Sequence, residues 1–424
     1  MKHHTQPSPN GRHGRVLLLT TPRTYRTAAF LEAAARLGIE AVQALDTPAA
    51  LAKEWRLELA IDFADVEGAT AAIANYAAER PFDAIIAVDD TGSILAAHAS
   101  EVLNLPHNAL VAAEAARNKC RMRQLLHQAG VSSPVFQPFT LADDPQVVSE
   151  QVRYPAVVKP VDLSGSRGVI RVNDPAELQA AVARLQKLLR SGQPAAETIY
   201  LVEQYIPGVE VALEGLLDNG QLHPLAIFDK PDPLEGPFFE ETIYVTPSRL
   251  PAETQAAVVA CAAQAAQALG LQTGPIHAEL RVNEDGPWIV EVAGRSIGGL
   301  CSKTLQFGTD ASLEELILAQ ACGLPIESLQ RDGRAGGVMM IPIPEAGLLR
   351  GVSGCEAAEA VPLIESVEIT AQLNYPLVPL PEGESYLGFI FARGDSPAAV
   401  EAALREAHEQ LTFEISPIIP LKSA

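Results

Sequence analysis

The stretch Ile276 to Arg295, IHAELRVNEDGPWIVEVAGR, predicts a β-hairpin with two carboxylates on its polar face. Side chains alternate sides along a strand, so His277 and Glu279 share one face while apolar residues occupy the other. The turn at 283–286 brings Glu291 of the returning strand opposite Glu279. Like charges placed opposite one another destabilise a sheet. We therefore expect a cation between the two glutamates.

The cation that best suits this pair is a magnesium ion. Mg²⁺ takes oxygen ligands and is usually held by one or two carboxylates together with substrate phosphates. Arg295, which follows Glu291 closely, would then meet charge on a transferred phosphoryl group or on an acceptor carboxylate. The alternative is an ordinary hairpin whose polar face meets water. His277 could orient a substrate or act as a base, or it could be hydrogen-bonded for structure only.

Length and composition indicate a multidomain globular protein. The chain has 424 residues, 48% hydrophobic and 20% charged, and the length suggests about three domains. A net charge of −21 argues against nucleic acid or an anionic membrane as the main partner. Residues 1–14 form a flexible leader without a signal-peptide pattern, and no apolar run can span a bilayer, so we expect a cytoplasmic protein. Five cysteines without a CxxC pair indicate free thiols.

The N-terminal part alternates between strand and helix patterns. Residues 15–21 and 82–88 are apolar strands, and residues 15–110 as a whole predict a parallel, doubly wound α/β domain. Asp89 and Asp90 end the second strand at the sheet edge where ligands bind, but they could equally cap the next helix. No GxGxxG follows the first strand, which weakens a dinucleotide-binding interpretation.

Cations and small residues characterise the next segment. Residues 108–130 predict one helix that carries Lys119 among other cations, which by itself is compatible with an ordinary surface helix. Residues 154–160 predict a strand that ends near Lys159, whose ammonium could bind phosphates as a point charge. The following loop could surround an anion with backbone N–H groups, because four of its residues are small. These small residues are Ser164, Gly165, Ser166 and Gly168.

Several further polar residues are candidates for binding. Glu203 and Glu210 flank a Pro-Gly break between two predicted strands, and they are either edge carboxylates or contacts for a nucleotide's amino group and ribose hydroxyls. Beyond Arg295, a glycine-rich turn could hold a substrate carboxylate on its backbone N–H groups. The residues of this turn are Ser296, Gly298 and Gly299.

The order of these motifs resembles the ATP-grasp superfamily over about residues 110–300. The motifs are Lys119, VVKPvdlSgSrGV, VEQYIPGvE and HAEL…WIVEVAGR. The resemblance implies that Lys119 and Lys159 hold the phosphates of ATP beneath the 164–168 loop, and that Arg295 stabilises formation of an acyl phosphate. It also implies that Glu203 and the backbone of Ile206 contact adenine, that Glu210 contacts the ribose, and that Glu279 and Glu291 bind Mg²⁺, or Mn²⁺ in its place.

One position departs from the pattern of the superfamily. Many ATP-grasp enzymes have an asparagine two residues after the second metal-binding glutamate, whereas this chain has Ala293. Alanine cannot ligate a metal. The number of ions, one or two, is therefore open.

Within the superfamily, the chain is most similar to the L-amino-acid ligase branch, through EVAGRSIGG, segment 229–241 and the C-terminal third. This resemblance implies an ATP-dependent carboxylate-amine ligase that joins an amino acid to an amine and releases ADP and phosphate. Lys230 would meet the γ-phosphate or the acceptor carboxylate, or it is a solvent-exposed lysine. Three domains are predicted: a pre-ATP-grasp domain at 15–110, an ATP-grasp domain at 111–330 and a small α+β domain at 331–424. Within the ATP-grasp domain, a small lid subdomain is predicted at about 120–196 and a large subdomain at about 197–330.

Other functions are compatible with the same motifs. An enzyme of this superfamily could activate bicarbonate instead, as biotin carboxylase does, although no biotin-attachment segment is recognisable. A non-catalytic nucleotide-binding subunit is a third possibility, but it would not need both carboxylates, both lysines and Arg295. The expected partners are small molecules. A small-residue helix at 256–269 could pack against a second copy in a homodimer or against its own domain.

Overall fold

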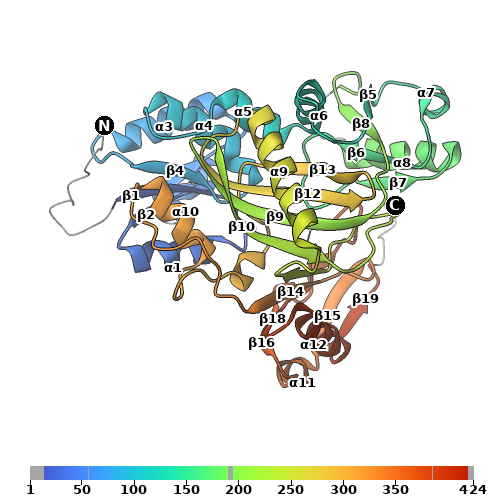
Figure 1. Ribbon diagram of the computed structural model, residues 1–424. Helices are drawn as coiled ribbons and strands as arrows, with labels where there is room; N and C mark the ends of the chain where they lie inside the picture. The colour runs from blue at the N-terminus through green and yellow to red at the C-terminus, as the bar shows by residue number, and fades with distance from the viewer. Residues whose placement is uncertain (1–13, 56, 190–193, 384, 419–424) are drawn as a thin grey trace, which may run out of the picture.

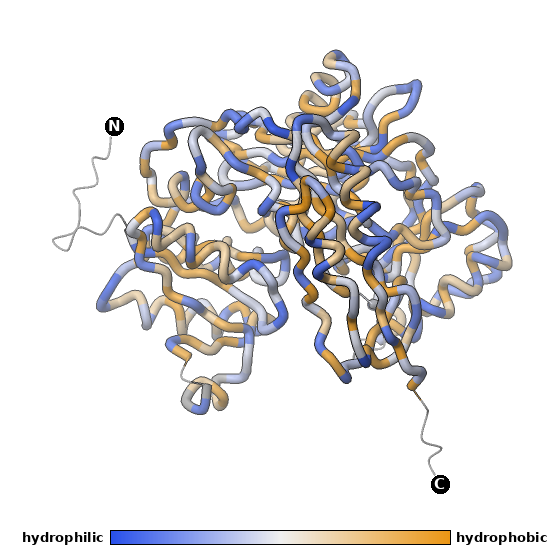
Figure 2. The backbone as a smooth tube through the Cα atoms, turned by 90° about the horizontal axis from the view of Figure 1, so that it is seen from below, coloured by the Kyte–Doolittle hydropathy of each residue, from blue (hydrophilic) through white to orange (hydrophobic). Residues whose placement is uncertain are grey.

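The computed structural model describes residues 14–55, 57–189, 194–383 and 385–418, so the leader predicted at 1–14 lies almost entirely outside the described residues. The described strands form four sheets, and the N-terminal part lies beside the large central sheet (Figure 1). In Figure 2, many apolar stretches of the tube run through the interior, whereas many of the outer turns are hydrophilic. Among the described residues, no helix is both long and apolar enough to cross a membrane.

The N-terminal sheet is parallel, as the alternating pattern predicts. Its strand β1 is buried along its whole length, because Val16 and Leu18 face one core and Leu17 and Leu19 face another on the opposite side. Helix α1 ends at Gly38, whose φ of 70° is readily adopted only without a side chain. The strands lie in the order β3 (Leu59–Ile61), β2 (Glu40–Asp46), β1 (Arg15–Thr20) and β4 (Ala84–Ala87), with helices α1 (Thr27–Leu37), α2 (Ala52–Trp55), α3 (Val66–Ala77) and α4 (Ser93–Val102).

Residues 108–130 do not form the single helix predicted from the sequence. The structure has two helices that break at Asn118, whose backbone is extended and whose side chain accepts a hydrogen bond from the Arg121 N–H at 2.9 Å. This side chain satisfies one of the N–H groups that a helix start leaves unpaired, so the break is an N-cap rather than a defect. Lys119 thereby becomes the first residue of the second helix. The two helices are α5 (Leu110–Arg117) and α6 (Lys119–Gln128).

The lid subdomain is a small antiparallel sheet packed against helices, and it extends past the predicted boundary near 196, because the strand at 199–204 pairs inside this sheet. Helix α8 begins with Asp174 as N-cap and a proline in its first turn, both favourable positions. The apolar face of α8 packs on the sheet through Leu178, Val182 and Leu185. The strands lie in the order β5 (Phe136–Thr140), β8 (Ile199–Gln204), β6 (Ala156–Pro160) and β7 (Ile170–Val172), with helices α7 (Pro145–Gln151) and α8 (Pro175–Leu188).

The large sheet has eight strands and includes the predicted hairpin at one edge. The apolar residues Ile276, Ala278 and Leu280 are completely buried against helix α9, which therefore packs on its own domain. The order is β13 (Gly286–Ala293), β12 (Gly274–Asn283), β9 (Val209–Asp218), β10 (Gln221–Lys230), β11 (Ile243–Thr246), β14 (Ala335–Ile341), β18 (Gly388–Gly394) and β16 (Ile364–Ile369). The helices are α9 (Ala252–Leu269) and α10 (Leu313–Ala321).

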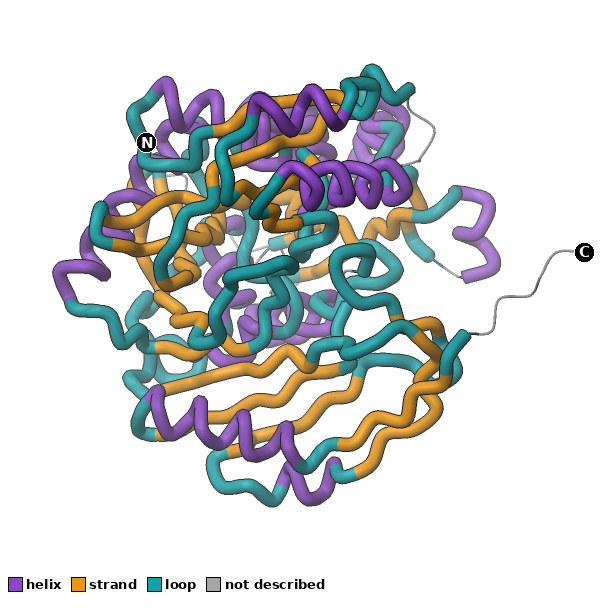
Figure 3. The backbone as a smooth tube through the Cα atoms, turned by 90° about the vertical axis from the view of Figure 1, so that its right-hand side faces the viewer, coloured by secondary structure: helices purple, strands orange, loops and turns teal. Residues whose placement is uncertain are grey.

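The C-terminal segment does not form a sheet wholly separate from the ATP-grasp part. Its strands β14, β18 and β16 continue the large sheet through β11, because β14 pairs with β11 over four residue pairs. Helices cover these strands at the bottom of Figures 1 and 3. A second, small sheet completes the segment. Its strands are β17 (Pro376–Leu377), β15 (Gly347–Ser353) and β19 (Thr412–Ser416), and its helices are α11 (Cys355–Glu359) and α12 (Pro397–Glu409).

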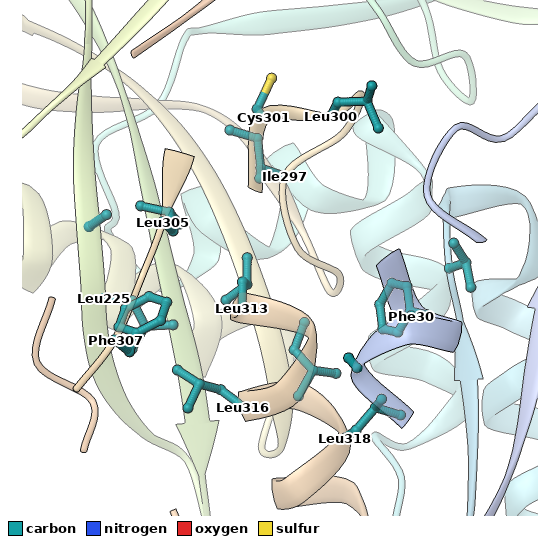
Figure 4. Packing of buried hydrophobic residues seen from close by; sticks show 14 of the residues in the cluster. Phe30, Leu225, Ile297, Leu300, Cys301, Leu305, Phe307, Leu313, Leu316 and Leu318 are labelled. Atoms are coloured by element: carbon teal, nitrogen blue, oxygen red, sulfur yellow. The ribbon is translucent and has the colours of Figure 1, made fainter. Parts of the chain in front are cut away.

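A continuous apolar core joins the N-terminal part to the large sheet. Phe30 of α1 packs toward Leu318 of α10, and the segment after the hairpin contributes Ile297 and Cys301 (Figure 4). Helix α10 is fixed at its start by a reciprocal capping box between Ser312 and Glu315. This packing places the end of β4 beside the end of the hairpin.

Candidate active site

One cavity of about 1390 Å³ receives side chains from all parts of the described chain. The N-terminal part contributes Asp90, the lid subdomain contributes Lys159 and the 163–167 loop, and the C-terminal segment contributes Tyr386. The polar face of the hairpin forms the floor. Such a convergence of charged groups from separate domains in one concave site is typical of an enzyme's active site.

Across the floor, the two hairpin glutamates are direct cross-strand partners, as the alternating pattern indicates. The register shifts between Glu279 and Leu280, so that Val290 has no partner of its own on β12. The Val290 carbonyl instead accepts a hydrogen bond from Arg123 at 2.5 Å. The bulge thus ties the hairpin to helix α6, immediately beside Glu291.

Lys119 reaches the hairpin from the start of α6. Its ammonium lies 3.0 Å from the Glu291 carboxylate and donates to the Leu163 carbonyl at 2.7 Å. The N-cap at Asn118 fixes where α6 begins, and it thereby orients the side chain of Lys119 toward Glu291. Lys119 therefore links the floor of the cavity to the small-residue loop above it.

Lys159 and Glu203 belong to a buried charge cluster that also contains Arg123. Lys159 lies 2.7 Å from one Glu203 oxygen, and Arg123 donates to both oxygens at 2.8 and 3.2 Å. Glu203 was predicted to contact a nucleotide's amino group, but in this structure its carboxylate already neutralises two cations. Its present contacts position Lys159. Arg123 was missed because one arginine in a cationic helix gives no sign of burial.

Burial determines the charge properties of this cluster. It lowers the pKa of Lys159 to about 8, although Glu203 partly offsets the effect. Burial alone would raise the pKa of Glu203, but Arg123 and Lys159 outweigh it and lower that pKa. Lys159 is therefore a cation at neutral pH and loses this charge within a mildly alkaline range.

We expect the affinity for ADP to fall as the pH rises above 8. A lysine is cationic below its pKa, and only the cation attracts phosphate, so the loss should approach about tenfold per pH unit above 8. Isothermal titration calorimetry across a pH series measures this dependence. The matched control is Lys159→Arg, whose guanidinium remains charged throughout and should give a flatter profile. Equal slopes for the two proteins would contradict the assignment.

The small-residue loop between β6 and β7 has an unusual backbone. Gly165, Ser166 and Gly168 have φ values of 63°, 56° and 73°, a region that side chains disfavour. A Cβ on Gly168 would lie 2.9 Å from a methyl carbon of Leu185, so α8 also approaches too closely for any larger residue. Ser164, Gly165 and Ser166 line the cavity. The loop is thus shaped to expose backbone at the roof of the site.

Lys230 lies in the middle of three carboxylates at the other side of the floor. Its ammonium lies 2.8 Å from Glu210, 2.5 Å from Glu241 and 3.4 Å from Glu279. These charges raise the pKa of Lys230 well above its usual value although burial opposes them. The alternative of a solvent-exposed lysine is therefore wrong, since only 7% of Lys230 is exposed. Glu241 was not recognised from the sequence.

Glu210, predicted to contact a ribose, is engaged within the protein. It pairs with Lys230 and also with Arg281 at 3.0 Å. Arg281 donates further to the Ile206 carbonyl at 3.0 Å, which fixes the strand end where adenine contacts were expected. Both Glu210 and Ile206 nevertheless line the cavity. Arg281 is a positioning residue that shares the polar hairpin face with Glu279.

His277 lies in the floor of the cavity and connects two glutamates. Its Nδ1 contacts the fully buried Glu214, and its Nε2 lies 3.3 Å from Glu279. Burial by itself lowers the pKa of His277, but the ion pair with Glu214 reverses the effect and raises that pKa to about 9. His277 is therefore an imidazolium at neutral pH. This state suits orientation of Glu279 and does not suit a general base.

Arg295 is held by the N-terminal part. Its guanidinium donates to Asp90 at 2.7 Å and to the Ser296 carbonyl at 2.9 Å. The pair lowers the pKa of Asp90 to about 2 in spite of burial, which alone would raise that pKa. Asp89, in contrast, caps the turn that follows β4. The sequence could not separate the two aspartates, because only packing places Asp90 beside Arg295.

The turn after Arg295 is also anchored. Arg26 of the N-terminal part donates to the Ser296 hydroxyl at 2.6 Å, and Glu214 accepts from the Ile297 N–H at 3.0 Å. Gly299 has a φ of 60°, and a Cβ there would approach Phe389 to 3.1 Å. The Ser296 hydroxyl is thus hydrogen-bonded to Arg26 within the protein, whereas Gly298 and Gly299 line the cavity.

The donor set suits a hard divalent cation. Glu279 and Glu291 face the cavity as paired carboxylates, and Ala293 lies next to them without a ligand atom. Among the described residues, the carboxylates whose oxygens cluster within 4.8 Å of one another are those of Glu210, Glu241 and Glu279, and this group does not include Glu291. The Lys230 ammonium already neutralises that group. Glu279 and Glu291 are themselves paired with Lys230 and Lys119, but they face the cavity from adjacent strands and are the carboxylates that would hold Mg²⁺ together with phosphate oxygens.

Comparisons with known families follow this division of the chain. An ATP-grasp N-terminal domain matches residues 31–107, an ATP-grasp domain matches 152–304, and L-amino acid ligase C-terminal domain 2 matches 339–416. The fold and the cavity therefore define an ATP-grasp protein. A crystal structure of L-amino acid ligase from Bacillus licheniformis superposes with a TM-score of 0.76 at 30% identity, over 96% of this chain and 99% of that one. The chain belongs to the L-amino acid ligase family.

Curated relatives match over shorter lengths. A protein of Sinorhizobium fredii is 28% identical over 75% of this chain and 65% of its own length. The alanine–anticapsin ligase of Bacillus subtilis strain 168 is 28% identical over 65% of this chain and 67% of its own length. The chain thus spans about two thirds of these relatives.

Proposed function

We propose that the protein is an ATP-dependent carboxylate-amine ligase that activates an amino-acid carboxylate as an acyl phosphate and joins it to an amine. The observation that carries the proposal is the meeting of Lys119, Lys159, Glu279, Glu291 and Arg295 around one cavity. A site that only bound nucleotide would need the lysines but not Arg295 beside a glycine-rich turn. The family membership supports the same reaction.

The reaction divides into two displacements. The carboxylate oxygen attacks the γ-phosphorus of ATP, the bond to the bridging oxygen breaks, and ADP leaves. The amine then attacks the acyl carbon, phosphate leaves, and the amine loses a proton to give a neutral amide. The first step is needed because a free carboxylate has no adequate leaving group.

Each charged group has a place in this scheme. Lys119 and Lys159 would hold the phosphates under the 164–168 loop, and their present partners Glu291 and Glu203 keep them aimed into the cavity. Mg²⁺, or Mn²⁺ in its place, would be held by Glu279 and Glu291 and would neutralise phosphate charge. Arg295 would meet the charge that develops on the transferred phosphoryl group or on the acceptor carboxylate.

The glycine-rich turn and Lys230 would orient the substrate. Backbone N–H groups at Gly298 and Gly299 would hold the carboxylate beside Arg295. Lys230 is buried among carboxylates, so it would act mainly by holding Glu210 and Glu241 and by balancing the charge of Glu279, rather than by direct contact with the γ-phosphate. Deeper in the cavity, Tyr244, Met340 and Tyr386 form an apolar wall suited to a side chain.

Phosphate release is the experiment that tests this proposal. ATP and Mg²⁺ are supplied with pairs of amino acids, with each amino acid alone and with bicarbonate, and products are analysed by mass spectrometry. Release that requires two amino acids and yields a new amide mass is expected. Phosphate release with bicarbonate alone would show a carboxylase-like activity instead of a ligase. Tight ATP binding without turnover would show that the protein is a nucleotide-binding subunit. Glu291→Gln serves as the inactive control.

A further inference from the structure

The loop at the roof of the cavity is attached to a part of the chain far away in sequence. We name residues 161–169 the phosphate loop and residues 378–383, between β17 and β18, the C-terminal strap. The Gly168 N–H donates to the Pro381 carbonyl at 2.7 Å, and Arg167 Nε donates to the Glu382 carbonyl at 3.0 Å. The strap therefore binds the phosphate loop mainly through its backbone.

An ion pair reinforces this attachment. Arg184, on helix α8 of the lid subdomain, donates to both oxygens of the Glu382 carboxylate at 2.8 Å each. A two-point arginine–carboxylate pair fixes orientation as well as distance. Both side chains are about two-fifths exposed, at 43% and 41%, so water screens the pair and little free energy is needed to separate it.

The strap is a tight turn closed by a backbone hydrogen bond of its own. The Gly383 N–H donates to the Pro379 carbonyl at 2.9 Å. A Cβ on Gly383 would lie 1.7 Å from the Val378 carbonyl oxygen, so no other residue permits this turn. Glu382 is thus presented by a preformed turn of the C-terminal segment.

Both partners of the contact border the active-site cavity. The phosphate loop contributes Ser164 to Arg167 to the lining, and the strap contributes Val378, Glu382 and Gly383. The loop and the strap therefore meet at the edge of the space that a nucleotide would occupy. Opening this contact would widen the cavity at its roof.

We propose that the C-terminal strap is a latch that holds the phosphate loop closed over the nucleotide, with Arg184 and Glu382 as its positioning pair. The inference rests on the proposed function, since it takes the bound molecule to be ATP. A closed latch slows nucleotide departure and keeps water from the acyl phosphate. The C-terminal segment thereby controls the lid subdomain as well as extending the sheet.

The test uses stopped-flow dissociation of a fluorescent ATP analogue from the full-length protein. Arg184→Ala and Glu382→Ala should each release the analogue about two- to fivefold faster than the unchanged protein, the range for a partly exposed ion pair. The charge swap Arg184→Glu with Glu382→Arg should restore a rate within about twofold of the original. In turnover assays, each single variant should release more phosphate per amide formed.

Glu368→Ala is the matched control, because Glu368 forms a similarly exposed ion pair with Lys303 at 2.6 Å and contacts neither loop nor strap. It should not change the dissociation rate. Unchanged rates in the two single variants, or a charge swap as fast as they are, would overturn the latch while the ligase assignment stands. Failure of the unchanged protein to bind the analogue would overturn the proposed function and the latch with it.

Discussion

Replacing Arg295 by alanine is expected to lower kcat for ATP-dependent amide formation by about two to three orders of magnitude. The guanidinium is largely shielded from solvent beside the glycine-rich turn, with 15% of its side chain exposed, and there it can meet charge that appears only in the transition state. KM for ATP should change little, because ground-state phosphates are assigned to Lys119 and Lys159. Steady-state kinetics with saturating amino acids separates the two parameters.

Two further variants serve as controls for the Arg295→Ala result. Arg36→Ala removes an exposed arginine that pairs with Glu315, and it should leave kcat unchanged. Asp90→Asn keeps Arg295 but removes the negative charge of its partner at 2.7 Å, so it should cause a smaller loss of kcat. A large rise in KM for ATP in Arg295→Ala would place this arginine on the substrate phosphates instead.

Replacing Glu279 by glutamine is expected to lower kcat/KM by at least about a hundredfold. The amide keeps the size of the side chain but removes the negative charge that would hold Mg²⁺ and that now balances Lys230 and His277. The loss should shrink as Mg²⁺ or Mn²⁺ is raised, because weaker ligation is compensated by concentration. Activity measured across a metal titration checks this expectation.

Glu284→Gln is the matched control for the metal site. Glu284 lies in the exposed turn of the same hairpin, outside the cavity, so its loss should affect neither activity nor metal dependence. Thermal unfolding of both variants excludes loss of the fold as the cause. If the Glu279→Gln variant is folded and responds to the metal titration as the unchanged protein does, Glu279 is not a metal ligand.

Local patterns in the sequence were sufficient for the hairpin and for the overall class. Alternation of polar and apolar residues placed Glu279 opposite Glu291, and the strand–loop–strand order placed Lys159 before the small-residue loop. These features depend on neighbours along the chain or across a short turn. The prediction of a single helix at 108–130 is wrong, although its cause is also local. Asn118 can cap a helix, and this capping signal ends one helix and begins the next.

The sequence by itself therefore determined the fold class, the pairing of the hairpin carboxylates and the position of Lys159 before the small-residue loop, because strand alternation and loop composition are short-range properties. Lys119 was singled out only by the resemblance to the ATP-grasp superfamily. Only the tertiary structure decided which charges meet. Glu203 pairs with Lys159 and Arg123, Arg295 pairs with Asp90, and Lys230 lies among three glutamates. These partners come from separate strands and domains, and a buried charge takes whichever opposite charge packing brings within reach. The attachment of the phosphate loop to the C-terminal strap follows from the same long-range packing.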